Sequence, residues 1–280
     1  MTRREALAGG VRRLLEAHVP DAEIDASLLL RFAAGLSRTD LLFDGGLELP
    51  EEELAIYEKL VSRRAEHIPL QYLTGTQAFM GMEFRVTEDV LIPRQDTERL
   101  TEEVLRCCGG KRVLDVCTGS GCIIISLAKL GDVREAEGCD LSEQALAVAR
   151  ANAAALDADV NFFSSDLLSG ARGRYDIIVS NPPYIPSSEI AALMPEVRIH
   201  EPRMALDGGE DGLCFYRRLI GQAGEFLVPG GRLFLEIGCT QAEAVSKLLL
   251  AGGFREIRVV KDYAGLDRVV AGVIGTEREK

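Results

Sequence analysis

The sequence predicts an α/β fold in which a mostly parallel sheet is surrounded by helices, with a helical bundle and a β-hairpin before it. From residue 111 onward, short apolar segments rich in β-branched residues alternate with longer segments of helical periodicity, as in βαβ units. The first 75 residues instead show helical patterns only. We therefore expect a bundle over residues 1–75, a β-hairpin linker over 76–95 and the sheet domain over 96–280.

The N-terminal segment is expected to form three long helices. Apolar residues recur at helical spacing in three stretches: 2–18, 21–36 and 50–67. The third begins with a proline and three acidic residues, as a helix start does. Loops are expected at 18–21, 35–40 and 44–50. After the bundle, β-rich segments flank Gly81 between Thr76 and Pro93, which favours a hairpin.

The remaining chain is expected to form seven strands and four helices. The candidate strands are 111–117, 135–140, 158–163, 175–181, 231–238, 256–262 and 268–275. The candidate helices are 121–130, 142–156, 212–227 and 241–253. Open sheets of this class bind ligands beyond the carboxyl ends of their strands. Residues that directly follow a strand are therefore the first candidates for a functional site.

Composition limits the possible functions. The chain has 280 residues, 47% of them hydrophobic, and a formal net charge of −12, which argues against a broad nucleic-acid-binding surface. Seven cysteines without a Cys-x-x-Cys pair argue against a disulfide framework and a zinc site. No signal peptide or membrane span is expected. We expect a monomeric cytoplasmic protein with reduced thiols and no membrane or direct nucleic-acid partner.

A glycine-containing loop follows the first strand of the sheet domain. The segment DVCTGSG, residues 115–121, passes from a strand through a turn into a helix, where small residues let a ligand approach the backbone. It lacks the third glycine of the dinucleotide fingerprint, because Ile124 stands there. The candidate ligand-binding residues in the loop are Cys117, Thr118, Gly119, Ser120 and Gly121.

Acidic residues end the next two strands. Asp140 is placed to accept both hydroxyls of a ribose, or alternatively to cap the helix that starts near Ser142. Asp166 is placed to accept from an adenine amino group while Leu167 packs on the ring. An ordinary aspartate in a turn is the alternative at Asp166, and taken singly it is the favoured reading of that residue.

The segment SNPPYI, residues 180–185, follows the apolar strand YDIIV. Two prolines end a strand and stiffen the backbone around Asn181, so the simplest reading is a strand stop. Together with the loop and the two aspartates, however, Asn181 completes a nucleoside site without a phosphate-binding motif. An adenosine-bearing, phosphate-free cofactor fits this set, and S-adenosyl-L-methionine is the obvious one.

The motifs together resemble one enzyme family. They are QYLTG, FRVTEDVLIPRQDTE, VLDVCTGSG, SNPPYI, EPRMAL, GGEDGL and KDYAGLDRVV. This set is similar to the HemK/PrmC family of release factor glutamine methyltransferases, which implies a Rossmann-like class I methyltransferase domain. Asn-Pro-Pro-Tyr alone also occurs in enzymes that methylate DNA adenine or RNA guanine. The flanking motifs favour the glutamine methyltransferases.

Two positions depart from the family pattern. Cys117 stands where the family usually has glycine, and Gln95 where it usually has proline. A cysteine is expected to fit the loop if its φ is negative and its side chain points away from the ligand. With a positive φ, cofactor affinity is expected to suffer.

The resemblance implies methyl transfer to the glutamine amide of the Gly-Gly-Gln motif in class-1 peptide chain release factors, with S-adenosyl-L-homocysteine as product. Asn181 and the Pro182 carbonyl are expected to accept the two amide hydrogens and to aim the nitrogen lone pair, while Tyr184 packs on the amide. Pro183 is expected to contact substrate as part of the same stretch. The helical bundle is expected to help dock the release factor.

Two other functions remain open on the sequence. One is an adenine-specific DNA methyltransferase, which would use the same stretch on a flipped base, although the net charge counts against it. The other is a non-catalytic module that retains the cofactor fold. Loss of Asn181 or Asp140 would have supported that module, and both residues are present.

Overall fold

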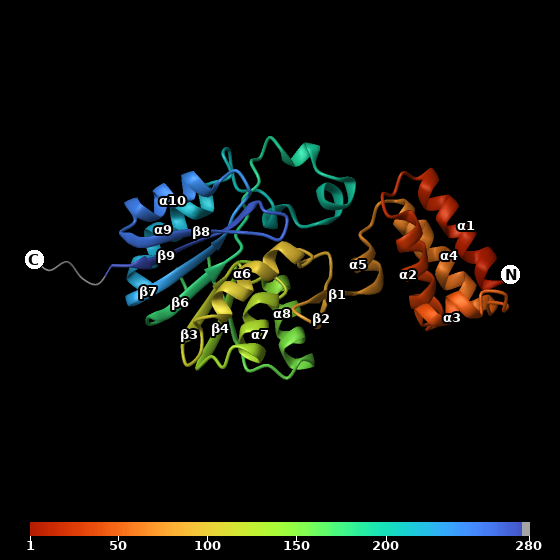
Figure 1. The fold of residues 1–280 in the computed structure, drawn as a ribbon, viewed down its shortest axis with the longest axis horizontal. Coiled ribbons are helices and arrows are strands. Elements are labelled where there is room, and N and C mark those ends of the chain that lie inside the picture. The colour runs from red at the N-terminus through yellow and green to blue at the C-terminus, as the bar shows by residue number, and fades with distance from the viewer. Residues whose placement is uncertain (276–280) are drawn as a thin grey trace, which may run out of the picture. The chain divides into compact units, whose positions relative to one another are not determined.

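The computed structural model describes residues 1–275, which form two compact units (Figure 1). The smaller unit contains residues 1–76 and a second segment, 194–200. The larger unit contains residues 77–193 and the chain from Glu201 onward. The hairpin therefore lies almost entirely in the larger unit, and a short piece of chain from the C-terminal half belongs to the smaller one.

The smaller unit is helical. Its helices are α1 (Arg3–Glu16), α2 (Ala22–Ala34), α3 (Arg38–Phe43), α4 (Glu51–Ala65) and α5 (Leu70–Thr74). Their apolar faces meet in one core around Leu14, Leu29, Leu30, Tyr57 and Val61. Helix α1 begins at a capping box in which the Thr2 side chain and the Glu5 side chain satisfy each other's backbone N–H groups.

Helices α3 and α5 were not expected from the sequence. A capping box between Ser37 and Asp40 starts α3 inside the segment that we assigned to a loop. Helix α5 is a single turn that ends at Gly75, whose φ is 80°. Helices of five or six residues are too short to show a clear hydrophobic period, so periodicity alone does not detect them.

A buried ion pair network holds the segment 194–200 in the smaller unit. Arg64 on α4 donates from Nε to Asp25 Oδ2 at 2.7 Å and from Nη2 to Glu196 Oε1 at 2.9 Å. Glu196 begins a short π-helical turn, η2 (Glu196–His200). Because removing one partner would leave a buried charge unpaired, this network is expected to resist separation.

The larger unit is built on a seven-stranded sheet in the order β5-β4-β3-β6-β7-β9-β8. The strands are β3 (Arg112–Val116), β4 (Glu135–Asp140), β5 (Asn161–Ser164), β6 (Tyr175–Ser180), β7 (Leu227–Glu236), β8 (Phe254–Lys261) and β9 (Asp267–Ile274). The first five in this list are parallel, and β9 runs antiparallel to both its neighbours. The expected mostly parallel seven-stranded sheet is confirmed. The expected hairpin is also present, as β1 (Thr76–Phe79) and β2 (Met82–Arg85).

Helices cover both faces of the sheet (Figure 1). They are α6 (Gln95–Leu105), α7 (Cys122–Leu130), α8 (Glu143–Ala155), α9 (Cys214–Phe226) and α10 (Ala242–Ala251). Strand residues alternate between two cores: Ile177 and Val179 of β6 pack with α6, α7 and α8, whereas Ile178 packs with α9 and α10. Both faces are thus buried, as a parallel sheet requires.

Helix α6 and the first part of β7 were not expected. No helix is expected over residues 95–105, of which 95–98 end the motif FRVTEDVLIPRQDTE, yet they form a helix whose buried face includes Leu100, Thr101 and Val104. Strand β7 begins at Leu227, earlier than the expected 231, because Leu227 still pairs with Tyr175 across an irregularity in the ladder.

The register brings four strand ends together. Val116 of β3 lies beside Cys139 of β4 and Ser180 of β6, and Ser180 lies beside Leu235 of β7. The next residues along the chain leave the sheet at one edge. Loops that are far apart in sequence are therefore neighbours there.

Candidate functional site

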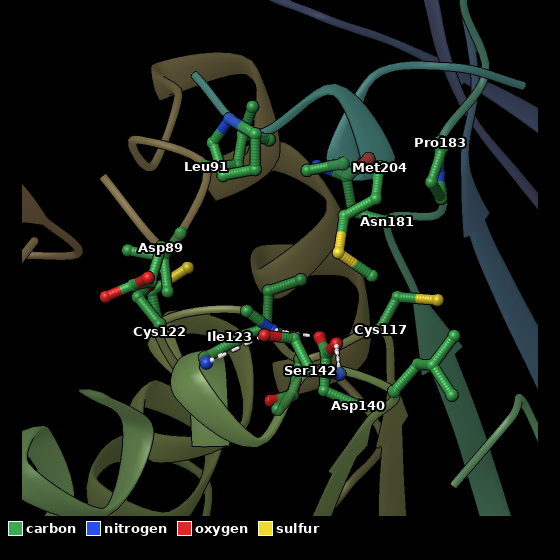
Figure 2. A pocket seen from close by; sticks show the side chains of 18 of the residues that line it. Asp89, Leu91, Cys117, Cys122, Ile123, Asp140, Ser142, Asn181, Pro183 and Met204 are labelled. Atoms are coloured by element: carbon green, nitrogen blue, oxygen red, sulfur yellow. Dashed lines mark hydrogen bonds between the residues drawn. The ribbon is translucent and has the colours of Figure 1, made fainter. Parts of the chain in front are cut away.

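A cavity of about 240 Å³ opens at this edge of the sheet (Figure 2). Nine of the residues predicted from the sequence line it: Cys117, Thr118, Gly119, Ser120, Asp140, Asp166, Leu167, Asn181 and Pro183. Three others, Gly121, Pro182 and Tyr184, do not. All of the lining residues belong to the larger unit.

The glycine loop reaches the cavity through its middle residues. Gly119 has a φ of 55°, and a Cβ at this position would meet no atom within 4 Å, so a ligand can approach the backbone there. Gly121 serves packing instead. A Cβ on Gly121 would lie 2.9 Å from Ile125 and 3.1 Å from Ala149. This close packing explains why the residue is a glycine and why it does not line the cavity.

Cys117 adopts a φ of 61°, so the negative φ that would suit a cysteine at this position is not observed. A left-handed conformation costs a residue with a Cβ more than it costs glycine. Cys117 also lines the cavity, where Figure 2 shows its side chain. Burial, which is the largest effect, raises the pKa of its thiol well above the usual range. Cys117 is therefore a strained, neutral thiol at the ligand site.

Asp115 supports the loop from below and was not predicted as a site residue. Its side chain is fully buried, and its Oδ2 accepts a 2.6 Å hydrogen bond from the Thr118 hydroxyl. Burial raises the pKa of Asp115 to about 7. The only hint in the sequence was its place at the end of the strand.

Asp140 points both carboxylate oxygens at backbone donors. Oδ2 accepts from Gly119 N at 2.9 Å and Oδ1 accepts from Ser142 N at 3.0 Å, as the dashed lines in Figure 2 indicate. Helix α8 is capped by Ser142 itself, so Asp140 does not act as the N-cap. Burial raises the pKa of Asp140. Each oxygen keeps a lone pair for a further donor such as a hydroxyl.

Asp166 has a partner that the sequence did not reveal. Its Oδ2 lies 2.7 Å from Nη2 of Arg218 on α9, in an ion pair that is half exposed. The adjacent Leu167 is buried and has a φ of 52°. Asp166 therefore lines the cavity with its negative charge already paired with Arg218. Its second oxygen has no hydrogen bond within residues 1–275.

The Asn-Pro-Pro-Tyr stretch lies directly after β6. Asn181 donates from Nδ2 to the Thr97 hydroxyl of α6 at 3.2 Å, which leaves its Oδ1 free to act as an acceptor. Pro182 and Pro183 are buried. Figure 2 shows Asn181 and Pro183 at the same side of the cavity.

Tyr184 turns away from the cavity. Its ring packs against the core on the α9 and α10 face, and its hydroxyl lies 3.5 Å from Glu236 Oε1. Its carbonyl accepts a 2.9 Å hydrogen bond from Gln241 Nε2. A Cβ on Gly212 would lie 2.4 Å from the same carbonyl oxygen, so the chain around Gly212 packs closely on it. In this structure Tyr184 anchors the stretch and does not line the cavity.

The outer rim of the cavity comes from two segments in which no site residue is expected from the sequence. Residues 89–94 and 202–207 contribute Leu91, Arg94 and Met204 to the wall. Arg94 Nη2 is paired with Glu201 Oε1, and Glu201 Oε2 accepts from Ile92 N at 3.3 Å. The buried Glu201 thus fastens the two segments to each other.

The cavity suits an adenosine-bearing ligand. Asp140 offers carboxylate lone pairs for ribose hydroxyls, Gly119 leaves open space, and Leu167, Ile123 and Met204 supply apolar surface. Among the residues that the structure describes, 1–275, the only arginine or lysine in its wall is Arg94, which is already paired with Glu201. A ligand with several phosphates therefore finds no cluster of cations here.

Comparison with known proteins agrees with this geometry. Residues 5–75 match the family described as PrmC N-terminal domain, and residues 96–210 match the methyltransferase small domain. The release factor glutamine methyltransferase of Geobacter sulfurreducens is 46% identical over 264 residues, covering 94% of this chain and 93% of that protein. The chain belongs to the release factor glutamine methyltransferase family.

Other members are similarly close. The release factor glutamine methyltransferase of Moorella thermoacetica is 44% identical over 96% of this chain and 97% of its own length. That of Caulobacter vibrioides is 42% identical over 93% of this chain and 92% of its own length. The likeness to family members thus covers both units.

Solved structures confirm the class I methyltransferase fold. A methyltransferase from Pyrococcus furiosus is similar with a TM-score of 0.57 at 19% identity, covering 76% of this chain and 98% of that one. The 16S rRNA N2 G1207 methyltransferase of T. thermophilus, solved with AdoMet and guanosine, has a TM-score of 0.51 at 19% identity and covers 71% of this chain and 49% of that one. These likenesses concern the fold alone.

Among residues 1–275, no helix combines the length and the apolar character that crossing a membrane requires.

Proposed function

We propose that this family member transfers a methyl group from S-adenosyl-L-methionine to the side-chain amide nitrogen of the glutamine in the Gly-Gly-Gln motif of class-1 peptide chain release factors. The observation that carries the proposal is the similarity to release factor glutamine methyltransferases, at 42–46% identity over 93–96% of this chain. The cavity adds support, because it places Asn181 at one wall and Asp140 at another.

The cofactor supplies a methyl group on a sulfonium and leaves as S-adenosyl-L-homocysteine. Asp140 and the backbone of residues 117–120 would hold its ribose and its chain, and Leu167 with Asp166 would meet the adenine. We assign these roles because the residues line one cavity and because Asp140 retains free lone pairs.

Asn181 and Pro182 orient the acceptor. A glutamine amide nitrogen is a weak nucleophile because its lone pair is delocalised into the carbonyl. Asn181 Oδ1 and the carbonyl of the buried Pro182 would accept the two amide hydrogens, and the nitrogen lone pair would then point toward the methyl group that the cofactor would supply. The same acceptors stabilise the positive charge that develops on nitrogen, and the proton leaves to water afterwards.

Mass spectrometry tests the proposal directly. The full chain is incubated with the cofactor and either a class-1 release factor or an adenine-containing DNA duplex. We expect one added methyl group on the Gly-Gly-Gln peptide, none when that glutamine is replaced by alanine, and none on the DNA. Methylation of the adenine alone would replace the proposal with the DNA methyltransferase, and binding of cofactor without any transfer would indicate a non-catalytic module.

The smaller unit is proposed to dock the release factor. It exposes large apolar side chains, among them Phe32, Leu42 and Phe43, which are 53%, 69% and 82% exposed. Exposed aromatic and aliphatic groups of this kind are typical anchors of protein interfaces. We place the complex in the cytoplasm, with the enzyme as a monomer and without direct contact to nucleic acid.

Phe43→Ser tests the docking role. We expect a higher KM for a whole release factor and an unchanged rate on a short Gly-Gly-Gln peptide, since the peptide lacks the surface of the release factor that would contact the helical unit. Leu250→Ser on α10 is the matched control, because Leu250 is also exposed, at 62%, but lies in the larger unit. An equal effect of both substitutions, or none for Phe43→Ser, would contradict docking through α3.

A further inference from the structure

One wall of the cavity carries a carboxylate that is bound by an arginine from another part of the chain. Asp166 lines the cavity, whereas Arg218 of α9 is not part of the wall. Arg218 donates from Nη2 to Asp166 Oδ2 at 2.7 Å. The function proposed above gives Asp166 a role at the adenine and leaves its partner Arg218 without one.

The backbone around Asp166 is held by short-range hydrogen bonds. The Ser165 hydroxyl donates to the Leu167 carbonyl at 2.6 Å, which closes the chain over Asp166. The Ser169 N–H donates to the Asp166 carbonyl at 3.2 Å. The side chain of Asp166 is then the part of this turn that can still rotate. Within residues 1–275 its one hydrogen-bond partner is Arg218.

This bond determines which carboxylate oxygen is offered to a ligand. An ionised carboxylate only accepts hydrogen bonds, and its two oxygens are equivalent until one of them is bound. Arg218 binds Oδ2, so Oδ1 of Asp166 is the oxygen left over. A guanidinium is planar and always charged, which suits it to holding a carboxylate in one orientation.

The pair gains importance when a ligand enters. The side chains of Asp166 and Arg218 are 50% and 41% exposed, so water screens their attraction and the pair adds little to the stability of the fold. A ring that packs on this wall would displace water from the Asp166 carboxylate. A charge that loses its water is costly unless a partner is already in place. Arg218 is such a partner.

We propose that Arg218 is a positioning residue for the cofactor, which holds Asp166 so that its free oxygen accepts a hydrogen bond from the 6-amino group of adenine. This inference rests on the proposed role of Asp166 at the adenine. Arg218 touches neither cofactor nor substrate in this assignment, and it acts through Asp166 alone.

Arg218→Met tests the proposal, because it removes the charge and the donors and keeps an unbranched side chain. The Kd of S-adenosyl-L-homocysteine, measured by calorimetry on the full chain, should rise about threefold to tenfold. Arg218→Lys keeps the charge without the planar group and should restore part of the affinity. The urea midpoint should change little in both variants. An unchanged Kd in Arg218→Met would overturn the proposal.

Arg217→Met is the matched control. Arg217 is the preceding residue of the same helix and forms an ion pair of similar exposure with Asp211. Neither Arg217 nor Asp211 lines the cavity. Its loss removes the same charge from the protein and should leave the Kd unchanged. An equal rise of Kd in both variants would show that the net charge matters and not the contact with Asp166, which would overturn the proposal.

A double-mutant cycle tests whether Arg218 acts through Asp166. In an Asp166→Ala background, Arg218→Met should cause no further rise of Kd, because the carboxylate that it orients is gone. A rise as large as in the wild-type background would mean that Arg218 binds the ligand directly, and the positioning role would then be wrong.

Asp166→Ala alone tests the function on which the inference rests. The Kd of S-adenosyl-L-homocysteine should rise about tenfold to a hundredfold, as for a lost hydrogen bond to a charged group. The Kd of the analogue with hydrogen in place of the 6-amino group should not rise, because this analogue has no hydrogen to donate. If Asp166→Ala bound S-adenosyl-L-homocysteine normally, the proposed adenine contact would fail. If it bound weakly and Arg218→Met bound normally, only the positioning role would fail.

Discussion

At the scale of single residues, Asn181 has one end of its amide bound and the other free. Its Nδ2 is held by Thr97, so only Oδ1 is left for a ligand. We expect Asn181→Ala to lower the single-turnover rate by about a hundredfold to a thousandfold, the usual cost of one preorganised polar partner. The cofactor Kd should change little. Single-turnover methylation of a release factor and calorimetry with the cofactor measure the two quantities.

Asp140→Ala is the contrasting variant for this prediction. Its carboxylate is assigned to the cofactor, so calorimetry should show weaker cofactor binding, with each lost hydrogen bond to the charged group costing about 1.5–3 kcal/mol. Asn181→Asp should keep part of the activity, because a carboxylate still accepts but cannot donate to Thr97. Normal rates for Asn181→Ala with the fold intact would reduce the stretch to a strand end stopped by prolines.

Cys117 carries backbone strain that a glycine at this position would avoid. Its φ of 61° suits glycine, so Cys117→Gly should raise the free energy of unfolding by about 1 kcal/mol and should keep or improve cofactor affinity. Cys117→Ala removes the thiol but keeps the Cβ and is expected to show no such gain. Urea denaturation of both variants measures the difference. A marked loss of cofactor affinity in Cys117→Gly would mean that the thiol packs on the ligand.

At the scale of elements, helix α6 starts with an unusual residue. Gln95 is the first residue of the helix and is exposed, and Arg94 before it is extended, with a ψ of 148°. Proline is compatible with both conditions, since the N–H of the first helical residue has no partner in the helix. Gln95→Pro should therefore raise the free energy of unfolding by about 0.4–1 kcal/mol.

The measurement is the urea midpoint at an unchanged m value. Gln95→Ala is the control, because alanine favours the helix without restricting the unfolded chain in the way proline does. If Gln95→Pro lowered the midpoint, the N–H of Gln95 would have to serve a contact that this helix start does not require.

Helix α6 also shows why the sequence alone does not predict part of the site. The sequence contains the recognisable motif IPRQDTE. In the structure part of this motif lies in α6 and brings Thr97 next to Asn181, a contact between residues 84 positions apart. Asp166 and Arg218 are 52 positions apart. Neither periodicity nor a local motif encodes which distant residue meets which.

At the scale of the whole molecule, two buried carboxyl groups link stability to pH. The pKa values of Asp115 and Glu236 are both raised to about 7, chiefly by burial. A carboxyl whose pKa is higher in the folded state contributes stability below its unfolded pKa of about 4, and this contribution is lost as the pH rises through about 7. We therefore expect these groups to lower the free energy of unfolding between pH 4 and pH 8 by up to about 3 kcal/mol each.

Asp115→Asn isolates one of these contributions. The free energy of unfolding of this variant relative to wild type should increase between pH 5 and pH 8, because the amide cannot ionise. Chemical denaturation at the two pH values measures the change, and comparing the change rather than the absolute values removes the effect of the altered bond to Thr118. A constant difference would show that Asp115 titrates in its ordinary range.

The sequence alone determined the fold class and the position of most of the site. Apolar β-branched segments alternating with helical ones specify a sheet covered on both faces, since each segment has to bury its apolar side. Once the strands are recognised, the site follows, because the ends of parallel strands lie at one edge. Nine of the predicted residues indeed line one cavity there.

Only the tertiary structure decided which distant residues the polar side chains of the site contact. It paired Asp166 with Arg218, bound Asn181 to Thr97, and turned Tyr184 into the core. It also assigned residues 194–200 to the helical unit through Glu196 and Arg64. The physical reason is the same in each case. A buried polar group has to find a donor or acceptor wherever the packing of distant segments provides one, and a local pattern carries no record of that choice.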